Sequence, residues 1–322
     1  MQKPLDMHKC AIIGCGNVGA TTAYSLMLDR TFSELVLIDI NKSKATGEAS
    51  DLNHGLPFVA PMNIYAGDYS DLSDASIIII TAGANQKPGQ TRTELVRENV
   101  KIFSSIVENI IKYNTDAILL VVTNPVDILT YVTLKISGFP ANRVIGSGTV
   151  LDTARLKYLA GEYLEVDNRN IHTFIIGEHG DSELAVWSCA TISGIPLSDF
   201  CRSNCLNCGM EALHTMYENV KNSAYKIIES KGATYYAIAE AVRRIVNAIV
   251  HNEDSVLPVS SLLNGHYGLS NVCLGVPCVV GNNGIKKILD LPLDDNEYRA
   301  LHESADKMKS IISSLYPEPA VL

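Results

Sequence analysis

The sequence has no long hydrophobic run and no apolar segment at its start. Its apolar stretches, such as Ile77 to Ile80 and Ala117 to Val122, are far shorter than the roughly 20 residues that span a bilayer. Asp6, His8 and Lys9 lie among the first ten residues, so a signal peptide is not expected. We therefore expect a cytoplasmic protein with no membrane partner.

Positive charge is also scarce. The 322-residue chain carries 26 Lys and Arg against 35 Asp and Glu, which gives a formal net charge of -9. Proteins that follow the phosphates of a nucleic acid rely on clustered Lys and Arg. We expect no nucleic-acid partner, and any small anion must be bound by local basic residues against an unfavourable overall field.

The cysteines do not suggest a disulfide framework. Several of the eight lie inside apolar runs, which is typical of reduced, buried thiols in an intracellular protein. Cys201, Cys205 and Cys208 have a spacing that some radical enzymes use for an iron-sulfur cluster. Their position late in the chain, between a predicted strand and a predicted helix, favours free thiols on a loop, and we expect no metal site.

The chain length suggests about two domains, at roughly 150 residues each. Up to about residue 150, short apolar β-branched runs alternate with segments of helix length, which predicts a doubly wound parallel sheet in an α/β domain. The predicted strands are 10–13, 35–40, 76–81, 117–123 and 143–146.

The second half has a different pattern, typical of a mixed α+β domain with antiparallel strands. We expect helices at 151–163, 234–251 and 301–315, and a strand pair at 172–176 and 186–191. Turn signals at Asn264-Gly265 and Asn282 to Gly284 predict antiparallel hairpins between residues 256 and 288. We place the division at 1–147 and 148–322, and the absence of a low-complexity linker predicts an interface between the halves.

A glycine motif suggests a dinucleotide site. Gly14, Gly16 and Gly19 follow a predicted strand and open a predicted helix, where backbone amides can approach a pyrophosphate. Asp39 follows 20 residues after Gly19, at the end of the next strand, where a carboxylate can accept hydrogen bonds from ribose hydroxyls. Its charge disfavours a 2′-phosphate, so we predict NAD rather than NADP; the alternative is a tight strand-to-helix turn.

Three other segments carry candidate chemistry. His179 lies between glycines after an apolar strand, where a substrate has room beside the imidazole. Asp152 and Arg155 share one face of a predicted helix, although a surface ion pair has the same spacing. The loop 83–92, which contains Arg92, follows a sheet strand, where ligand-contacting loops of α/β proteins lie.

These segments together resemble the bacterial L-lactate dehydrogenases of the lactate and malate dehydrogenase superfamily. The resemblance covers nearly the whole chain and depends on the blocks TAGANQKPGQTR, VTNPVD, GSGTVLDTAR, IIGEHGDSE and KGATYYAIA. It implies a Rossmann-type NAD domain, a substrate domain, a cytoplasmic homotetramer, and an oxidoreductase that interconverts pyruvate and lactate in glycolysis and fermentation.

The resemblance also implies residue roles. His179 would exchange a proton with the substrate oxygen, and Asp152 would hold the imidazole and stabilise its protonated form. Arg155 would bind the substrate carboxylate through two parallel hydrogen bonds. Arg92 would polarise the ketone carbonyl when its loop closes.

Further contacts follow from the same resemblance. Asn124 would bind the substrate oxygen, and Thr234 would line the side-chain pocket. The implied cofactor-contacting residues are Gly14, Gly16, Val18, Gly19, Asp39, Lys44, Tyr69, Gly83, Ala84, Ser105, Thr123, Asn124 and Ser147.

Gln86 bears on the substrate. Malate enzymes of the family have Arg at this position to pair the second carboxylate of oxaloacetate, and a neutral amide would leave that charge buried without a partner. Gln86 therefore favours lactate. Two alternatives stay open: a dehydrogenase for longer 2-oxo acids, and a non-catalytic module that senses NADH.

The resemblance raises one allosteric possibility. Bacterial relatives are often activated by fructose 1,6-bisphosphate, bound by a basic residue and a His that correspond here to Lys157 and His172. The family often has Arg at the first position, and Lys keeps the charge but not the forked recognition of phosphate. The alternative is a solvated Lys and an interface His.

Overall fold

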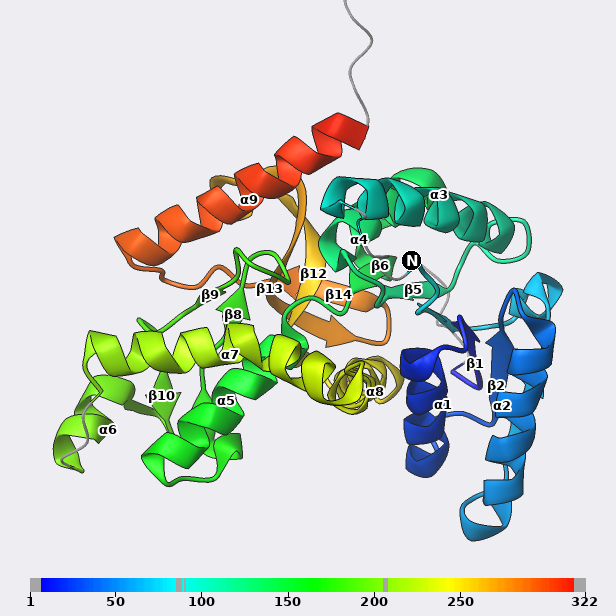
Figure 1. Ribbon diagram of the computed structural model, residues 1–322, viewed down its shortest axis with the longest axis horizontal. Helices are drawn as coiled ribbons and strands as arrows, with labels where there is room; N and C mark the ends of the chain where they lie inside the picture. The colour runs from blue at the N-terminus through cyan, green and yellow to red at the C-terminus, as the bar shows by residue number, and fades with distance from the viewer. Residues whose placement is uncertain (1–6, 85–88, 90, 205–207, 316–322) are drawn as a thin grey trace, which may run out of the picture.

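The structure is a computed structural model that describes residues 7–84, 89, 91–204 and 208–315 (Figure 1). Gln86 and Cys205 lie outside the described residues, and so does the side chain of Arg92. Within the described part of the chain, none of the helices combines the length and the hydrophobicity of a transmembrane segment.

The first half forms six parallel strands in the order β3-β2-β1-β4-β5-β6, the doubly wound order of dinucleotide-binding folds. The predicted parallel α/β sheet is therefore confirmed. Its strands are β1 (Lys9–Ile13), β2 (Glu34–Ile38), β3 (Asn63–Ala66), β4 (Ile77–Ile80), β5 (Ile118–Val121) and β6 (Val144–Gly146). The sequence reading missed β3, because only Ile64 of this strand is fully buried and its first residue, Asn63, is exposed.

Helices on both faces explain why these strands do not alternate between apolar and polar residues. In β4, Ile77 and Ile79 belong to the core cluster that contains Leu26 of α1, whereas Ile78 and Ile80 belong to the cluster of α3. Both faces of the strand are thus buried. The helices of this half are α1 (Asn17–Asp29), α2 (Lys42–Gly55), α3 (Arg92–Ile110) and α4 (Val126–Ser137).

Three antiparallel strands of the second half extend the same sheet. The strands β12 (Ser255–Asn264), β13 (Ser270–Gly281) and β14 (Gly284–Ile288) pair in sequence, as the turn signals predicted. Ser260 of β12 pairs with Gly146 of β6, so a nine-stranded sheet crosses the division predicted at residue 147. That division stays a prediction.

The predicted strand pair at 172–176 and 186–191 is wrong in its extent: of these residues only His172, Ile175, Ile176 and Thr191 lie in strands, because the chain changes sheet after two residues on each side. Strand β7 (Ile171–His172) pairs with β10 (Thr191–Ile192), which also pairs with β11 (Ile195–Pro196). Strand β8 (Ile175–Ile176) pairs with β9 (Leu184–Ala185) in a separate ribbon.

The remaining helices surround these ribbons and the antiparallel strands (Figure 1). They are α5 (Val150–Leu164), α6 (Leu197–Ser203), α7 (Met210–Lys231), α8 (Tyr236–Val250) and α9 (Asp295–Leu315). Short 3-10 helices are η1 (Leu56–Phe58), η2 (Tyr69–Leu72), η3 (Ala141–Arg143), η4 (Asn168–Asn170) and η5 (His266–Gly268).

One cysteine prediction is wrong. Cys201 and Cys208, expected as free thiols on a loop, form a disulfide with their Cα atoms 6.0 Å apart. Cys201 is a buried residue of α6, and Cys208 packs against the same core cluster, within bonding distance of it. Among the cysteines that the structure describes, the free thiols that are buried, as expected, are Cys10, Cys15, Cys273 and Cys278.

Candidate active site

The glycine loop allows α1 to pack closely on the sheet. Gly14 has φ of 104°, and a Cβ atom there would clash with the backbone of Ala82. A Cβ at Gly19 would meet the carbonyl of Gly14 and lie 2.7 Å from Oγ1 of Thr81. Gly16 instead has open space where its side chain would be, which leaves room for a ligand at the start of α1.

Asp39 lies directly against this loop. One carboxylate oxygen of Asp39 accepts a hydrogen bond from the Cys15 amide at 2.7 Å, and the other accepts one from the Asn41 amide at 2.8 Å. A cavity of about 440 Å³ contains this carboxylate, and its walls include Gly14, Gly16, Lys44, Tyr69 and Gly83. A carboxylate fixed beside a glycine loop at the end of β2 fits the ribose of an adenine dinucleotide.

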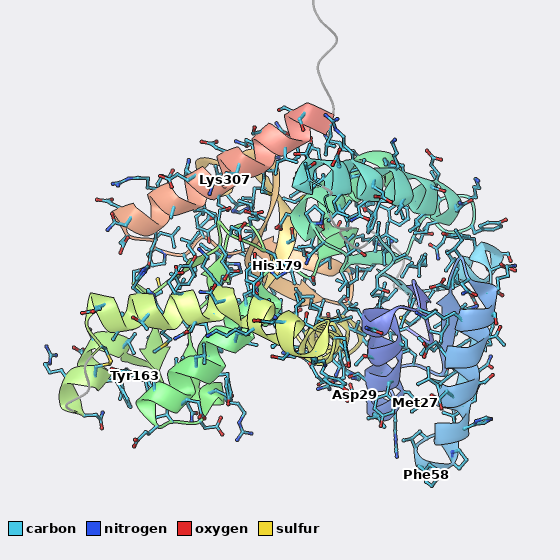
Figure 2. All side chains as sticks on the ribbon, in the orientation of Figure 1. Met27, Asp29, Phe58, Tyr163, His179 and Lys307 are labelled. Atoms are coloured by element: carbon cyan, nitrogen blue, oxygen red, sulfur yellow. A yellow bond between two sulfur atoms is a disulfide. The ribbon has the colours of Figure 1, made fainter. Side chains whose placement is uncertain are left out.

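The cavity continues from Asp39 toward the second half of the molecule. A neighbouring cavity of about 470 Å³ shares Thr81 and Gly83 with it and extends to His179, which lies near the middle of the molecule in the view of Figure 2. The predicted contacts along this second cavity are Val18, Gly83, Ala84, Thr123, Asn124, Ser147, Arg155 and Thr234. Ser105 is exposed on α3, and it is the adjacent Ile106 that lines the Asp39 cavity.

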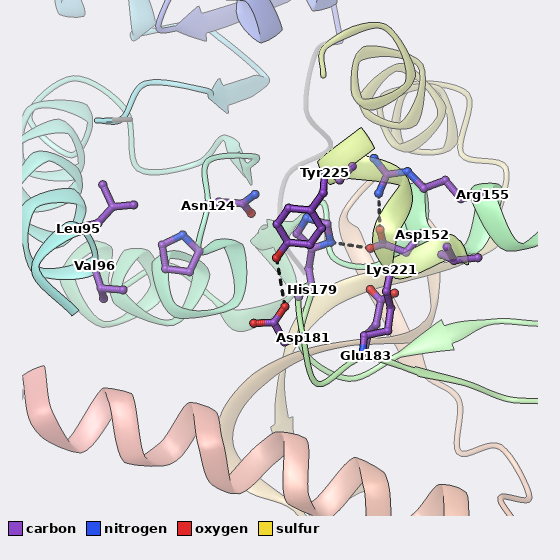
Figure 3. Close-up of a pocket in the computed structure, with 14 residues that line it drawn as sticks. Leu95, Val96, Asn124, Asp152, Arg155, His179, Asp181, Glu183, Lys221 and Tyr225 are labelled. Atoms are coloured by element: carbon purple, nitrogen blue, oxygen red, sulfur yellow. Dashed lines mark hydrogen bonds and ion pairs between the residues drawn. The ribbon is translucent and has the colours of Figure 1, made fainter. Parts of the chain in front are cut away.

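Asp152 joins the His and the Arg at the inner end of this groove (Figure 3). Its Oδ2 lies 2.5 Å from Nδ1 of His179, and its Oδ1 accepts a 2.8 Å hydrogen bond from Nη1 of Arg155. Asp152 is only 2% exposed. The pair is therefore not a surface ion pair, and the arrangement leaves Nε2 of His179 as the ring nitrogen available to a ligand.

The electrostatics favour a protonated imidazole. Burial alone would lower the pKa of His179, but the charge and hydrogen bond of Asp152 outweigh it and raise the pKa to about 9. Burial would raise the pKa of Asp152, yet His179 and Arg155 lower it. Near neutral pH the site thus holds an imidazolium beside a carboxylate, which can give a proton to a substrate oxygen.

A third cavity, of about 420 Å³, meets the groove at His179. Its walls include Asp152, Arg155 and Asn124, together with Glu183, Lys221 and Tyr225. Helix α7 contributes Val220, Lys221, Ala224 and Tyr225 to the walls of this cavity, and Figure 3 labels Tyr225 and His179 among its lining residues. Asn124 and Thr234 both line cavities that reach His179.

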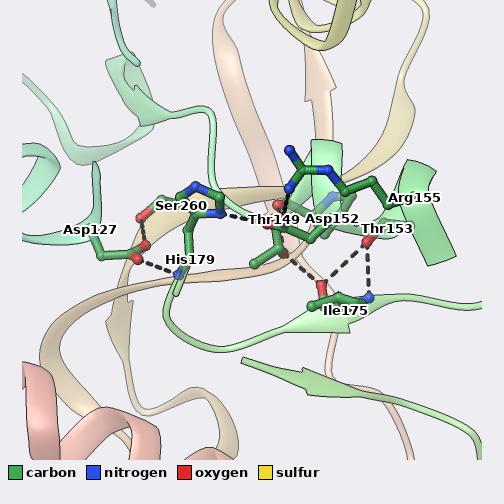
Figure 4. Close-up of polar contacts among 9 residues, drawn as sticks. Asp127, Thr149, Asp152, Thr153, Arg155, Ile175, His179 and Ser260 are labelled. Carbon is green, nitrogen blue, oxygen red and sulfur yellow. Dashed lines mark hydrogen bonds and ion pairs between the residues drawn. The ribbon is translucent and has the colours of Figure 1, made fainter. Parts of the chain in front are cut away.

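The sequence reading missed two buried carboxyl groups near His179. Asp127, in the VTNPVD block, accepts a hydrogen bond from the backbone amide of His179 at 2.8 Å (Figure 4). Glu183 is 6% exposed, and burial raises its pKa to about 8. Neither residue stands out from its sequence neighbours, so burial, visible only in the fold, was the missing signal.

Glu183, Asp152 and His179 offer ligand atoms within 4.8 Å of one another, a spacing that a metal ion could use. Both carboxylate oxygens of Asp152 are already engaged by His179 and Arg155. The guanidinium of Arg155 also opposes binding of a cation, so these three residues are better suited to proton transfer than to metal binding.

Neither of the two candidate allosteric residues lines the three cavities described above. Lys157 is half-buried on α5, and burial lowers its pKa. His172 is exposed on β7, which packs against α5.

The predicted substrate residue Arg92 is the first residue of α3.

Comparison with known proteins gives family matches along the chain. Residues 8–146 match the model of the lactate/malate dehydrogenase NAD binding domain, and residues 149–317 match the alpha/beta C-terminal domain of the same family.

Individual relatives are similar over nearly their whole length. The chain is 60% identical to the L-lactate dehydrogenase of Acetivibrio thermocellus over 96% of this chain and 98% of the relative. It is 54% identical to L-lactate dehydrogenase 1 of Clostridium acetobutylicum, with the same coverage. The ligand-bound crystal structure of the minor L-lactate dehydrogenase from Enterococcus mundtii has a TM-score of 0.94 and 43% identity, over 97% of this chain and 99% of that one.

Proposed function

Because the chain belongs to the lactate/malate dehydrogenase family of NAD-dependent oxidoreductases, we propose that it is an L-lactate dehydrogenase that reversibly converts pyruvate and NADH to L-lactate and NAD+. The observation that carries the proposal is the buried Asp152–His179 pair beside Arg155, at the inner end of the groove that begins at Asp39. The relatives named L-lactate dehydrogenase support the choice of substrate.

In this proposal His179 is the proton donor. Its imidazolium gives the proton on Nε2 to the ketone oxygen of pyruvate, while Asp152 holds Nδ1 and stabilises the charge. Bound NADH supplies the hydride to the carbonyl carbon. In the reverse direction neutral His179 accepts the proton of the lactate hydroxyl.

Two arginines complete the proposed substrate site. Arg155 donates one hydrogen bond to Asp152 through Nη1, and its other donors serve the substrate carboxylate. Arg92 at the start of α3 is the proposed polarising group for the ketone, and Asn124 the second contact to that oxygen. Removal of such a donor costs about 10²- to 10³-fold in rate.

The substrate proposal is tested by NADH oxidation with pyruvate, oxaloacetate and 2-oxoisocaproate. We expect kcat/KM to be highest for pyruvate, since Gln86 cannot pair a second carboxylate. Faster turnover of oxaloacetate would contradict the argument from Gln86, and faster turnover of 2-oxoisocaproate would favour the enzyme for longer 2-oxo acids. NADH binding without any turnover would identify a sensing module instead.

The same assay tests the allosteric proposal. Lys157 and His172 are the proposed ligands of fructose 1,6-bisphosphate, supported by the packing of α5 against β7. The bisphosphate should lower the KM for pyruvate in the wild type and not in Lys157→Ala. An unchanged KM at millimolar bisphosphate and neutral pH would end the proposal.

Three broader features belong to the same proposal. Residues 1–147 bind mainly the cofactor and residues 148–322 mainly the substrate, with Asn124 and Arg92 reaching across. A homotetramer in the cytoplasm is the proposed state, supported by large apolar side chains exposed on the packed helices α1 and α8, such as Leu28 and Tyr236. Light scattering of the purified protein tests the assembly.

A further inference from the structure

Asp127 connects three segments that are distant in sequence. It lies in the first turn of α4, three residues after Asn124, and is 2% exposed. Its Oδ2 accepts the amide hydrogen of His179 at 2.8 Å, and its Oδ1 accepts the hydroxyl of Ser260 on β12 at 2.5 Å. Figure 4 shows the carboxylate between these two donors.

A buried carboxylate at this place has an energetic cost that simple packing does not require. Burial raises the pKa of Asp127 to about 6, even though the hydrogen bonds from Ser260 and from the His179 amide act in the opposite direction. The positive end of the α4 dipole offsets part of the cost. A group of this kind is more common at functional sites than in a core that only has to be filled.

The position of the two hydrogen bonds suggests what the carboxylate does. Asn124 and His179 both line the cavity at the proposed reacting centre, but they come from different halves of the chain. The short segment from Asn124 to Asp127 spans the gap between them, because Asp127 binds the backbone of His179 directly. A shift of this segment would change the distance between the two groups that meet the substrate oxygen.

We propose that Asp127 is a positioning residue for the hydride-transfer reaction: its carboxylate fixes the backbone of His179 relative to Asn124 and adds negative charge that keeps the imidazole protonated. This inference rests on the proposed role of His179. Asp127 itself does not contact the substrate in this proposal, and it acts through the position and the charge state of His179.

Other charged groups contribute to the same field. The groups that face Asp127 are His179 and Glu178 on the loop after β8 and Cys273 on β13. Those that face the imidazole are Asp152 on α5, Glu183 after the loop and Asp127 on α4, with Arg155 bonded to Asp152. Asp127 differs from Asp152, which bonds to the ring, because its hydrogen bond is to the backbone amide of His179.

The test is the Asp127→Asn variant, with Asp306→Asn on the exposed face of α9 as the matched control for loss of one carboxylate. Asparagine keeps the size of the side chain but removes its charge. It also replaces one of the two acceptor oxygens with an NH2 group, which donates hydrogen bonds. Since a displacement of about 1 Å at a reacting group can cost roughly 100-fold, we expect kcat for pyruvate to fall about 10- to 100-fold. The Kd for NADH and the KM for pyruvate should change less than about threefold.

The pH profile separates positioning from a purely structural role. Loss of the Asp127 charge makes the imidazolium less stable, so the alkaline limb of pyruvate reduction should move to lower pH in Asp127→Asn. The proposal would be overturned if Asp127→Asn had the wild-type kcat per NADH-binding site and the wild-type alkaline limb, and differed only in a lower melting temperature. Asp306→Asn should match the wild type in all of these measurements.

Ser260→Ala keeps the proposal testable if Asp127→Asn does not fold. Without the Ser260 hydroxyl the Asp127 carboxylate is less stabilised, so its protonation moves to higher pH. The acid limb of kcat should then move to higher pH, and an acid limb identical to the wild type would overturn the proposal in that case. If the wild type prefers another 2-oxo acid, the proposed substrate fails, but the same variants measured with that acid still decide the role of Asp127.

Discussion

At the residue scale, three carboxyl groups act on His179, the proposed proton donor, although one would be enough to pair with its imidazole. Asp152 bonds to the ring of His179, Asp127 adds further negative charge to its surroundings, and Glu183 does so when it ionises above its pKa of about 8. Each carboxyl is nearly buried, so its charge is poorly screened by solvent. The ionisation of His179 should therefore depend on all three residues rather than on Asp152 alone.

Glu183→Gln tests this dependence. Above its own pKa of about 8, the ionised Glu183 stabilises the imidazolium, so its loss should lower the pKa of His179 below the wild-type value of about 9. Pyruvate reduction needs the protonated form and is lost as pH rises through this pKa. The alkaline limb of kcat/KM should thus move to lower pH, with about two- to threefold lower activity on that limb.

The control for this prediction is Glu218→Gln on α7, where the carboxylate is 43% exposed and paired with Lys221. Its pH profile should match that of the wild type. An alkaline limb that does not move in Glu183→Gln would show that Asp152 and Asp127 alone determine the ionisation of His179.

From the sequence, the residues with candidate chemistry could be predicted better than the buried residues that surround them. Asp39 was predicted from its spacing after the glycines, and the structure places it against the glycine loop. Asp127 and Glu183 were missed because an acidic residue near a turn is usually solvated, and only tertiary packing buries these two. The roles proposed for His179 and Asp152 stay predictions, supported by their geometry.

At the element scale, the disulfide between Cys201 and Cys208 links the end of α6 to the start of α7. Helix α7 also supplies Lys221 and Tyr225 to the cavity beside His179. The bond is therefore anchored just before Met210, where a helix begins whose middle lines the proposed substrate site.

Reduction of this bond should lower stability without abolishing activity. For a sequence separation of 7 residues, loop closure contributes about 2 kcal/mol to stability, so a reductant should lower the melting temperature by a few degrees. Cys208→Ser should melt like the reduced wild type and should not respond further to the reductant. Its kcat should stay within about twofold of the wild type, because the cavity residues of α7 lie beyond its first turn.

An equal melting temperature with and without reductant, together with a thiol count that reduction does not change, would contradict the presence of the bond. A Cys189→Ser variant, which changes a free, half-buried thiol, is the control and should respond to the reductant like the wild type.

Elements with a strong apolar pattern of their own were predictable, and strands of two residues were not. The strand β4 is a continuous run of isoleucine, and the buried residues of helix α8 recur at helical spacing, so both can be recognised from the sequence. Strands of two residues such as β8 and β9 exist only because a partner segment lies beside them. Local sequence does not encode such pairs, so tertiary packing determines them.

At the scale of the whole molecule, the two halves share both a sheet and a core. Strand β12 joins β6 through the pairing of Ser260 with Gly146. One hydrophobic cluster also contains Ile12 of β1, Val242 of α8 and Val276 of β13. The sequence predicted an interface between two domains, but the pairing partner of a strand more than 100 residues away could not be derived from local pattern.

This continuity predicts a single unfolding transition. Helices α1 and α8 pack together, and the hydroxyl of Ser25 donates a 2.6 Å hydrogen bond to Glu240 across the halves. Trp187, the one tryptophan of the sequence, packs in the second half and reports on it alone. Its fluorescence transition should therefore coincide with the transition of the whole chain in far-ultraviolet circular dichroism.

A ligand confined to the Asp39 end of the groove makes the coupling measurable. ADP-ribose lacks the nicotinamide and should bind at Asp39 and the glycine loop, far along the groove from His179. At about 100 times its Kd it stabilises the folded state by about 2.7 kcal/mol, and in a cooperative molecule the Trp187 transition shifts upward together with the circular dichroism signal. If ADP-ribose raises only the circular dichroism transition and leaves the Trp187 transition unchanged, the halves unfold independently, and the shared sheet does not couple cofactor binding to the substrate half.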